Sequence, residues 1–222
     1  MPTQVYNELL RVYSHQGWWP INNEYKKRST LSDTEKFEII VGALLTQNTS
    51  WIQVEKALNE LRKNNCLSVQ GIIETKQETL GQYIKPAGYF NQKSERLKII
   101  AQFLLQHPLA ELQQMETNRL RALLLSVKGI GPETADSIIL YAFSKPSFVI
   151  DTYTKRIMSR IGLCRKDVTY DELQELIVRN IPVDVEMYNE YHALLVEHAK
   201  QHCQTKPICA DCPLSKDCKK LI

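Results

Sequence analysis

Apolar residues recur every three or four positions along most of the chain, which is the periodicity of an amphipathic α-helix. The first clear run follows Ser32 and Glu35, whose spacing is that of a helix-capping box. A second helix is expected from Trp51. The same pattern predicts further helices at about 76–84, 92–106, 117–127, 132–142, 152–161, 170–180 and 183–201. Because Phe148–Ile150 alone has the character of a short extended segment, we expect an all-α protein.

Polar residues between these runs mark where the helices begin and end. Two further pairs repeat the capping-box spacing, Thr75 with Glu78 and Thr169 with Glu172. Asn48–Ser50 forms a polar break that ends one helix and can cap the next.

The composition is that of a folded protein with little overall charge bias. Of its 222 residues, 43% are hydrophobic and 24% are charged, so the chain can bury a sizeable core. The formal net charge of +3 permits nucleic-acid binding without arguing for it. No apolar run approaches the ~20 residues that span a bilayer, and we see no signal-peptide hydrophobic region at the N-terminus. We therefore expect a cytoplasmic protein, associated with the nucleoid in a prokaryote and not with a membrane.

A turn with two glycines lies between two predicted helices, in the order Lys128-Gly129-Ile130-Gly131-Pro132. Proline suits the first turn of the helix that follows. Backbone N–H groups beside a helix N-terminus can bind one DNA phosphate without reading sequence. Taken alone, the motif is explained equally well as an ordinary interhelical turn.

One carboxylate, Asp151, follows the apolar segment Phe148–Ile150 and precedes a predicted helix. An Asp at such a place often only caps the helix, and this is the stronger interpretation of the segment by itself. Because the glycine turn lies one helix upstream, we favour a functional carboxylate.

Cysteines are grouped near the C-terminus in the pattern C-x5-C-x2-C-x5-C, formed by Cys203, Cys209, Cys212 and Cys218. Thiols stay reduced in the cytoplasm, where clustered cysteines are more often metal ligands than disulfides. Four thiolates in a short loop suit either a [4Fe-4S] cluster or a structural zinc ion, and the spacing does not decide between them.

Five motifs occur in one order over about residues 33–218: Leu45–Thr49, Gly88–Ser94, Gly129–Ala135, Val149–Tyr153 and the four cysteines. Together they resemble the helix-hairpin-helix glycosylases of the endonuclease III superfamily. The resemblance implies two helical domains flanking a DNA-binding cleft, a six-helix barrel domain at 36–144 with the hairpin and an iron–sulfur domain formed by 1–35 plus 145–222. It also favours a [4Fe-4S] cluster over zinc, although the first cysteine gap is one residue shorter than is common in endonuclease III.

The resemblance also assigns roles to hairpin residues. Superfamily members that cut the strand carry a lysine nucleophile two residues after the second glycine, and here that position is Glu133. We therefore expect a monofunctional enzyme in which water attacks and Asp151 supports the water and the developing positive charge. Glu133 either adds a second negative charge beside a cationic base or simply favours the helix N-terminus. The hairpin residues expected on the DNA backbone are Lys128, Gly129, Gly131 and Thr134.

Aromatic residues narrow the expected substrate. The segments around Trp18-Trp19-Pro20 and Gln47–Trp51 are similar to those of the 3-methyladenine DNA glycosylase III subfamily, whose aromatic residues line the base pocket. Trp18, Trp19 and Trp51 would do so here, because indole faces attract the positive ring of an N-alkylated purine. The alternative is that all three are core residues. Gln47 and Tyr89 are the expected wedges that fill the duplex where the base is flipped out.

The leading hypothesis is therefore a monomer that excises an N-alkylated purine, such as 3-methyladenine, from damaged duplex DNA in base-excision repair. The alternatives are a glycosylase of the same fold for oxidised pyrimidines or mismatched bases, and a non-catalytic binder of DNA structures, against which Asp151 argues. Basic residues that could follow the phosphates, although each is more often a solvated charge, are Lys93, Arg96, Lys128, Lys155, Arg156 and Arg160.

Overall fold

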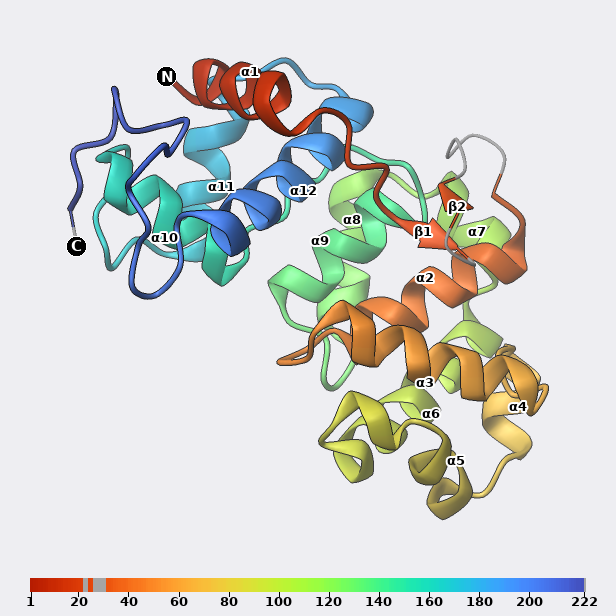
Figure 1. Cartoon of the computed structure of the whole chain (residues 1–222). Coiled ribbons are helices and arrows are strands. Elements are labelled where there is room, and N and C mark those ends of the chain that lie inside the picture. The colour runs from red at the N-terminus through yellow and green to blue at the C-terminus, as the bar shows by residue number, and fades with distance from the viewer. Residues whose placement is uncertain (22–23, 26–30, 222) are drawn as a thin grey trace. The chain divides into compact units, whose positions relative to one another are not determined.

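The computed structural model describes residues 1–21, 24–25 and 31–221, and these residues are mostly helical (Figure 1). The all-α prediction is confirmed for them. Their backbone packs into two units. We call Trp19–Lys145 the hairpin unit, and Met1–Trp18 together with Pro146–Ile222 the cysteine unit. The described part of 19–35 thus packs with the hairpin unit, whereas the sequence analysis grouped it with the C-terminal part.

The hairpin unit begins with a short antiparallel pair, β1 (Pro20–Ile21) and β2 (Glu24–Tyr25), in which Pro20 lies opposite Tyr25. The remaining elements that the structure describes in this unit are helices. Its helices are α2 (Asp33–Leu45), α3 (Trp51–Lys63), α4 (Val69–Glu74), α5 (Gln77–Tyr83), the 3-10 helix η2 (Lys85–Ala87), α6 (Phe90–Gln106), α7 (Leu109–Gln114), α8 (Thr117–Leu125) and α9 (Pro132–Tyr141).

The central helix of this unit is α2. Every residue from Phe37 to Leu45 is buried, and the helix packs against α3, α6, α7 and α9. Ser32 Oγ accepts a hydrogen bond from the Glu35 N–H while the Glu35 carboxylate accepts one from the Ser32 N–H, which confirms the capping box. The polar loop after Leu45 therefore follows directly on the buried part of this helix.

The cysteine unit consists of α1 (Pro2–Tyr13), α10 (Thr152–Ile161), α11 (Tyr170–Val178), α12 (Val185–Gln201) and the cysteine-containing C-terminal segment. Helices α1 and α12 lie side by side although they come from opposite ends of the chain (Figure 1). Tyr191 donates a hydrogen bond to the Pro2 carbonyl at 2.8 Å, which ties the two together. None of the helices that the described residues form has the length and apolar character needed to cross a bilayer.

Three local expectations have different outcomes. The capping box of Thr169 and Glu172 is confirmed at the start of α11. That of Thr75 and Glu78 is wrong, because Lys76 is the N-cap of α5 and the Thr75 hydroxyl donates back to the Gly71 carbonyl at the end of α4. Phe148–Ile150 is buried but belongs to no described strand, since side chains rather than a neighbouring strand bind its backbone.

Candidate functional site

The two glycines of the turn between α8 and α9 serve different purposes. Gly129 has a φ of +93°, and a Cβ there would lie 2.7 Å from Arg96 Cγ, so a larger residue would be both strained and obstructed. Gly131 is the exposed N-cap of α9, and a Cβ there would meet no atom within 4 Å. Because the first N–H groups of any α-helix lack an intrahelical acceptor, this turn offers donors and space to an anion.

The residues around the turn differ in their exposure to solvent. Lys128 and Glu133 are exposed, and the Lys128 ammonium pairs with Glu95 at 2.7 Å. Glu133 lies in the first turn of α9, where a carboxylate complements the helix dipole. Thr134, by contrast, is buried, and its hydroxyl accepts a hydrogen bond from Gln47 at 2.9 Å. Thr134 therefore supports the turn from inside rather than facing the DNA.

The side-chain amide of Gln47 is fixed on the hairpin. Its Nε2 donates to the Gly129 carbonyl at 3.1 Å and to Thr134 Oγ1, and its Oε1 accepts a hydrogen bond from Arg96. To fill the gap left by a flipped base, this side chain would first have to leave three partners. In this arrangement the Gln47 side chain is bound to the hairpin and is not free to act as a wedge.

Tyr89 is the exposed aromatic residue just before α6. Its side chain is 68% exposed, and its backbone has φ 45° and ψ 33°, the left-handed region. That conformation is uncommon for a bulky residue and costs about 1–3 kcal/mol, so the surroundings must hold it. Tyr89 thus combines an exposed aromatic ring with a strained backbone.

Lys93, which we expected on the phosphates, is buried instead and only 2% exposed. Its Nζ donates to the Leu45 carbonyl at 2.8 Å, the Ala87 carbonyl at 2.8 Å and Thr49 Oγ1 at 2.6 Å. Burial, and then the nearby charge of Arg96, lower the pKa of Lys93 to about 8. Lys93 therefore connects loops of the hairpin unit from the inside.

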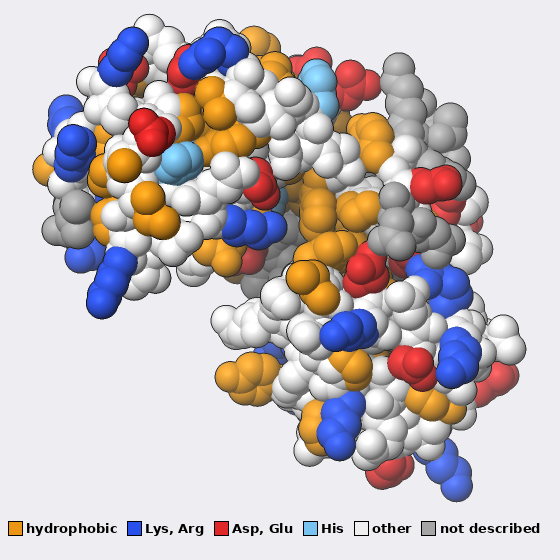
Figure 2. Space-filling model, viewed as in Figure 1, with side chains coloured by type: hydrophobic (Ala, Val, Ile, Leu, Met, Phe, Trp, Pro, Cys, Tyr) orange, Lys and Arg blue, Asp and Glu red, His pale blue; other side chains and the backbone are white. Residues whose placement is uncertain are grey.

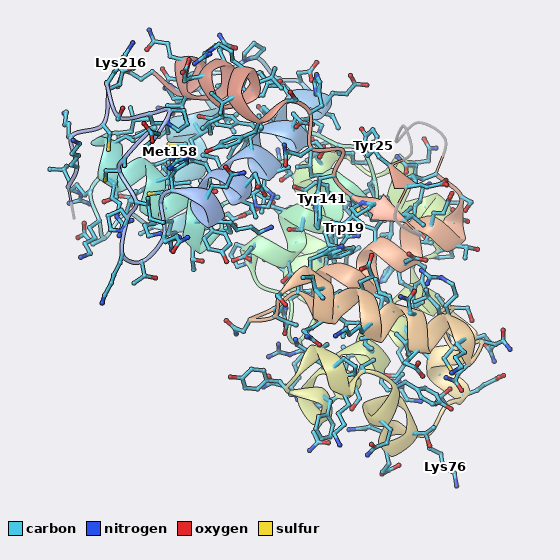
Figure 3. The ribbon with its side chains drawn as sticks, in the orientation of Figure 1. Trp19, Tyr25, Lys76, Tyr141, Met158 and Lys216 are labelled. Atoms are coloured by element: carbon cyan, nitrogen blue, oxygen red, sulfur yellow. The ribbon has the colours of Figure 1, made fainter. Side chains whose placement is uncertain are left out.

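Two aromatic residues of the hairpin unit, Trp51 and Tyr141, pack around Trp19, and Figure 3 labels Trp19 and Tyr141. The Trp19 and Trp51 rings are 5.1 Å apart at 87°, and those of Trp19 and Tyr141 are 5.3 Å apart at 55°. Trp19 is 5% exposed, whereas Trp51 is half-buried. Two rings at right angles do not form a parallel sandwich, so Trp19 and Trp51 do not enclose a base between parallel faces. Trp18, the third predicted pocket residue, is half-buried and belongs to the cysteine unit.

Asp151 is the N-cap of α10 in the cysteine unit and is 9% exposed. Its Oδ1 accepts a hydrogen bond from the Thr154 N–H at 2.6 Å, and its Oδ2 lies 3.5 Å from His192 Nε2 on α12. Burial acts to raise the pKa of Asp151, but the contact with His192 and the hydrogen bond from Thr154 outweigh it, so the pKa lies below its ordinary value. Asp151 thus both caps the helix and stays ionised.

The histidine beside Asp151 was missed by the sequence analysis. His192 lies on α12, and no spacing or motif connects it to the start of α10. Both side chains are almost enclosed, with 12% of His192 and 11% of Asp151 exposed. A partner of this kind fixes the direction of one carboxylate oxygen and favours its charged form.

The four C-terminal cysteines line one cavity of the cysteine unit. All four are free thiols. The Arg160 guanidinium lies 3.5 Å from Cys203 Sγ, and the Lys220 N–H donates to Cys218 Sγ at 3.4 Å. Among the residues that the structure describes, no three His, Cys, Asp or Glu side chains are grouped as a site for one metal ion requires.

Two arginines that we expected on phosphates hold this cysteine segment. Arg156 donates to the Cys203 carbonyl at 2.8 Å, and Arg160 donates to the carbonyls of Gln204 at 2.5 Å and Thr205 at 2.9 Å. On the face that Figure 2 shows, Lys and Arg side chains are scattered among acidic and uncharged ones in each unit.

These features together define a class of protein. The hairpin unit presents an exposed glycine turn that leads into a helix, and the cysteine unit presents a buried, ionised Asp at the start of another helix, which are the features of a helix-hairpin-helix DNA glycosylase. Residues 41–183 match the family described as the HhH-GPD superfamily of base excision DNA repair proteins. The chain belongs to this family.

Comparisons with individual proteins agree. A Methanocaldococcus jannaschii protein named as a DNA repair glycosylase is 42% identical over 219 residues, which are 97% of this chain and 94% of that protein. The structure of the Helicobacter pylori 3-methyladenine DNA glycosylase bound to 1,N6-ethenoadenine has a TM-score of 0.74 and 27% identity, covering 90% of this chain and 97% of that one. A trapped endonuclease III–DNA covalent intermediate has a TM-score of 0.78 at 22% identity, covers 99% and 96%, and shows the same fold.

The protein is therefore a DNA glycosylase of base-excision repair, an enzyme that acts on N-glycosyl bonds with DNA as its partner.

Proposed function

We propose that the protein is a monofunctional glycosylase that hydrolyses the bond between an N-alkylated purine, such as 3-methyladenine, and its sugar in damaged duplex DNA. The observation that carries this proposal is Asp151, an enclosed carboxylate kept ionised by His192 and the Thr154 N–H. Cleavage of an N-glycosidic bond develops positive charge on the sugar. A fixed carboxylate stabilises that charge and can orient or deprotonate the attacking water.

Glu133 supports hydrolysis over strand cleavage. It is exposed in the first turn of α9, at the position where the family resemblance puts the lysine nucleophile of strand-cutting members. A carboxylate cannot form the Schiff base through which an amine cuts the strand. Water is then the nucleophile, and the expected product is a free base and an unbroken abasic strand. Glu133 also adds negative charge beside a cationic base.

The aromatic cluster supports a purine that carries positive charge. Trp51 is half-buried, and Trp19 packs edge-on against it at 5.1 Å between ring centroids. Stacking on an aromatic side chain is worth roughly 1–3 kcal/mol per base but does not choose among bases. A cationic ring strengthens the stacking on indole, and alkylation also makes the base a better leaving group. The adenine adduct bound by the 27% identical H. pylori glycosylase fits this substrate class. Trp18 stays a candidate for contact with the base.

Contacts with the duplex are proposed at two loops of the hairpin unit. The N–H groups at Gly129 and Gly131, with Lys128 beside them, would bind one phosphate. Tyr89 would intercalate where the base leaves the stack and offset the few kcal/mol that flipping costs. We further propose that the enzyme acts as a monomer.

We propose that Cys203, Cys209, Cys212 and Cys218 hold a [4Fe-4S] cluster. All four line one cavity, and four thiolates are the usual ligands of such a cluster. Arg156 and Arg160 already anchor the segment, so the bound cluster would add order to the C-terminal end of the unit. Its proposed role is structural.

The test is a panel of duplexes that each contain one lesion: 3-methyladenine, 1,N6-ethenoadenine, a G·T mismatch, an A·G mismatch and an oxidised pyrimidine. Free base is quantified directly under single-turnover conditions. We expect release of the alkylated purines. Release of thymine, mismatched adenine or oxidised pyrimidine with intact alkylated duplex would instead assign the enzyme to another lesion, and binding without any release would make it a DNA-structure binder.

A further inference from the structure

Two cations of α6, Lys93 and Arg96, donate hydrogen bonds to neighbouring loops of the hairpin unit. Lys93 uses all three donors of its ammonium group on the Leu45 carbonyl, the Ala87 carbonyl and Thr49 Oγ1. Leu45 is the last residue of α2 and Ala87 the last of η2, and carbonyls at helix C-termini carry partial negative charge. Lys93 therefore joins the loop after α2 to the loop before α6.

Arg96 extends the same connection to the hairpin. Its guanidinium donates to Gln47 Oε1, and its aliphatic part lies against Gly129, where a Cβ would come within 2.7 Å. Gln47 in turn donates to the Gly129 carbonyl and to Thr134 Oγ1. Arg96 and Gln47 together fix the glycine turn on the loop after α2.

We propose that Lys93 and Arg96 are positioning residues that hold three DNA-facing loops, 46–50, 87–89 and 128–131, as one preorganised surface. This inference deepens the proposed function and rests on it, because the loops matter only if they meet DNA. With the loops already fixed, Tyr89 and the phosphate-binding turn engage the duplex together, and little ordering is left for the step in which the base leaves the stack.

The chemistry of the buried amine favours this role over simple packing. Burying an ammonium group is costly even when its hydrogen bonds are satisfied, and an apolar side chain of similar volume often stabilises a core at least as well. The left-handed backbone of Tyr89 also persists only if its surroundings impose it. The Ala87 carbonyl that Lys93 binds lies two residues before Tyr89, so Lys93 is placed to impose it.

Helix α6 supplies a matched control. Lys98 lies on the same helix, and its Nζ donates to the Ile73 carbonyl at 2.7 Å and to the Thr75 carbonyl, at the end of α4. Lys93→Met and Lys98→Met therefore each remove one amine that binds backbone carbonyls. Only the first touches loops that the proposal places on DNA. Melting temperatures of both variants give the structural cost of each change.

The readouts are single-turnover base release and the fluorescence of 2-aminopurine placed beside an abasic-site analogue, which reports unstacking. We expect Lys93→Met to slow base release about tenfold relative to Lys98→Met and to reduce the 2-aminopurine signal. Arg96→Met should give the same pattern, and it carries the test if Lys93→Met does not fold. Equal effects of the Lys93 and Lys98 variants on both readouts would overturn the proposal. If the wild type releases no base at all, the proposed function fails, while the fluorescence comparison still decides the role of the two cations.

Discussion

Replacing Asp151 by Asn separates its two roles. Asn is nearly as good an N-cap as Asp, so it should still accept the hydrogen bond that the Thr154 N–H now gives at 2.6 Å. The fold should therefore lose little stability, and the variant should bind an abasic duplex normally. The charge, however, is gone. Removing one preorganised electrostatic group from a transition state typically costs 10²–10³ in rate, about 2.7–4 kcal/mol, and we expect a loss of that order.

The assay is single-turnover release of 3-methyladenine, with the melting temperature and the Kd for abasic duplex measured on the same samples. Asp151→Ala is the control, because it removes cap and charge together. Its free energy of unfolding should fall by about 1 kcal/mol, and its rate of base release should fall as well. If Asp151→Asn releases base at nearly the wild-type rate, Asp151 is only a cap and the proposed mechanism is wrong.

Three further predictions concern the surroundings of the site. His192→Phe removes a contact that lowers the pKa of Asp151 and leaves the burial that raises it. The acid limb of the rate–pH profile should therefore move to higher pH. An acid limb that does not move would show that His192 has no electrostatic role. Trp51→Ala should lower the rate of alkylated-purine release by roughly 5- to 150-fold, the equivalent of one stacking contact, with little change in Kd for abasic duplex. Equal losses of base release and of abasic-duplex binding would indicate a packing role beside Trp19. Purified protein should be yellow-brown with four irons, and Cys203→Ala should lose both iron and stability, whereas one zinc and no iron would reject the cluster.

Local signals in the sequence were sufficient for the fold class and for several helix boundaries. Ser32 with Glu35 and Thr169 with Glu172 act within one helical turn, so the residues that make each cap are visible in the sequence. The same spacing misled at Thr75, because its hydroxyl is used by the preceding helix. A capping pattern cannot tell which of two adjacent helices will take the residue.

The candidate site was only partly predictable for a similar reason. Asp151 and the glycine turn sit in recognisable local patterns, whereas the partners that define their chemistry come from distant segments. His192 reaches Asp151 from another helix, and the burial of Lys93 and the fixed amide of Gln47 depend on how α2, α6 and the hairpin pack. Side-chain charge suggested phosphate contacts for Lys93, but burial assigns it to the interior.

The most direct test of the account is the fate of the strand when the wild-type enzyme meets a duplex with one 3-methyladenine. Released base and strand breaks are quantified in parallel, with and without alkali, and a second set of reactions contains borohydride to trap any Schiff base. The account predicts stoichiometric free base, a strand that breaks only after alkali, and no trapped protein–DNA adduct, because Glu133 rather than an amine stands in the hairpin. Efficient trapping with strand breaks that need no alkali would contradict it.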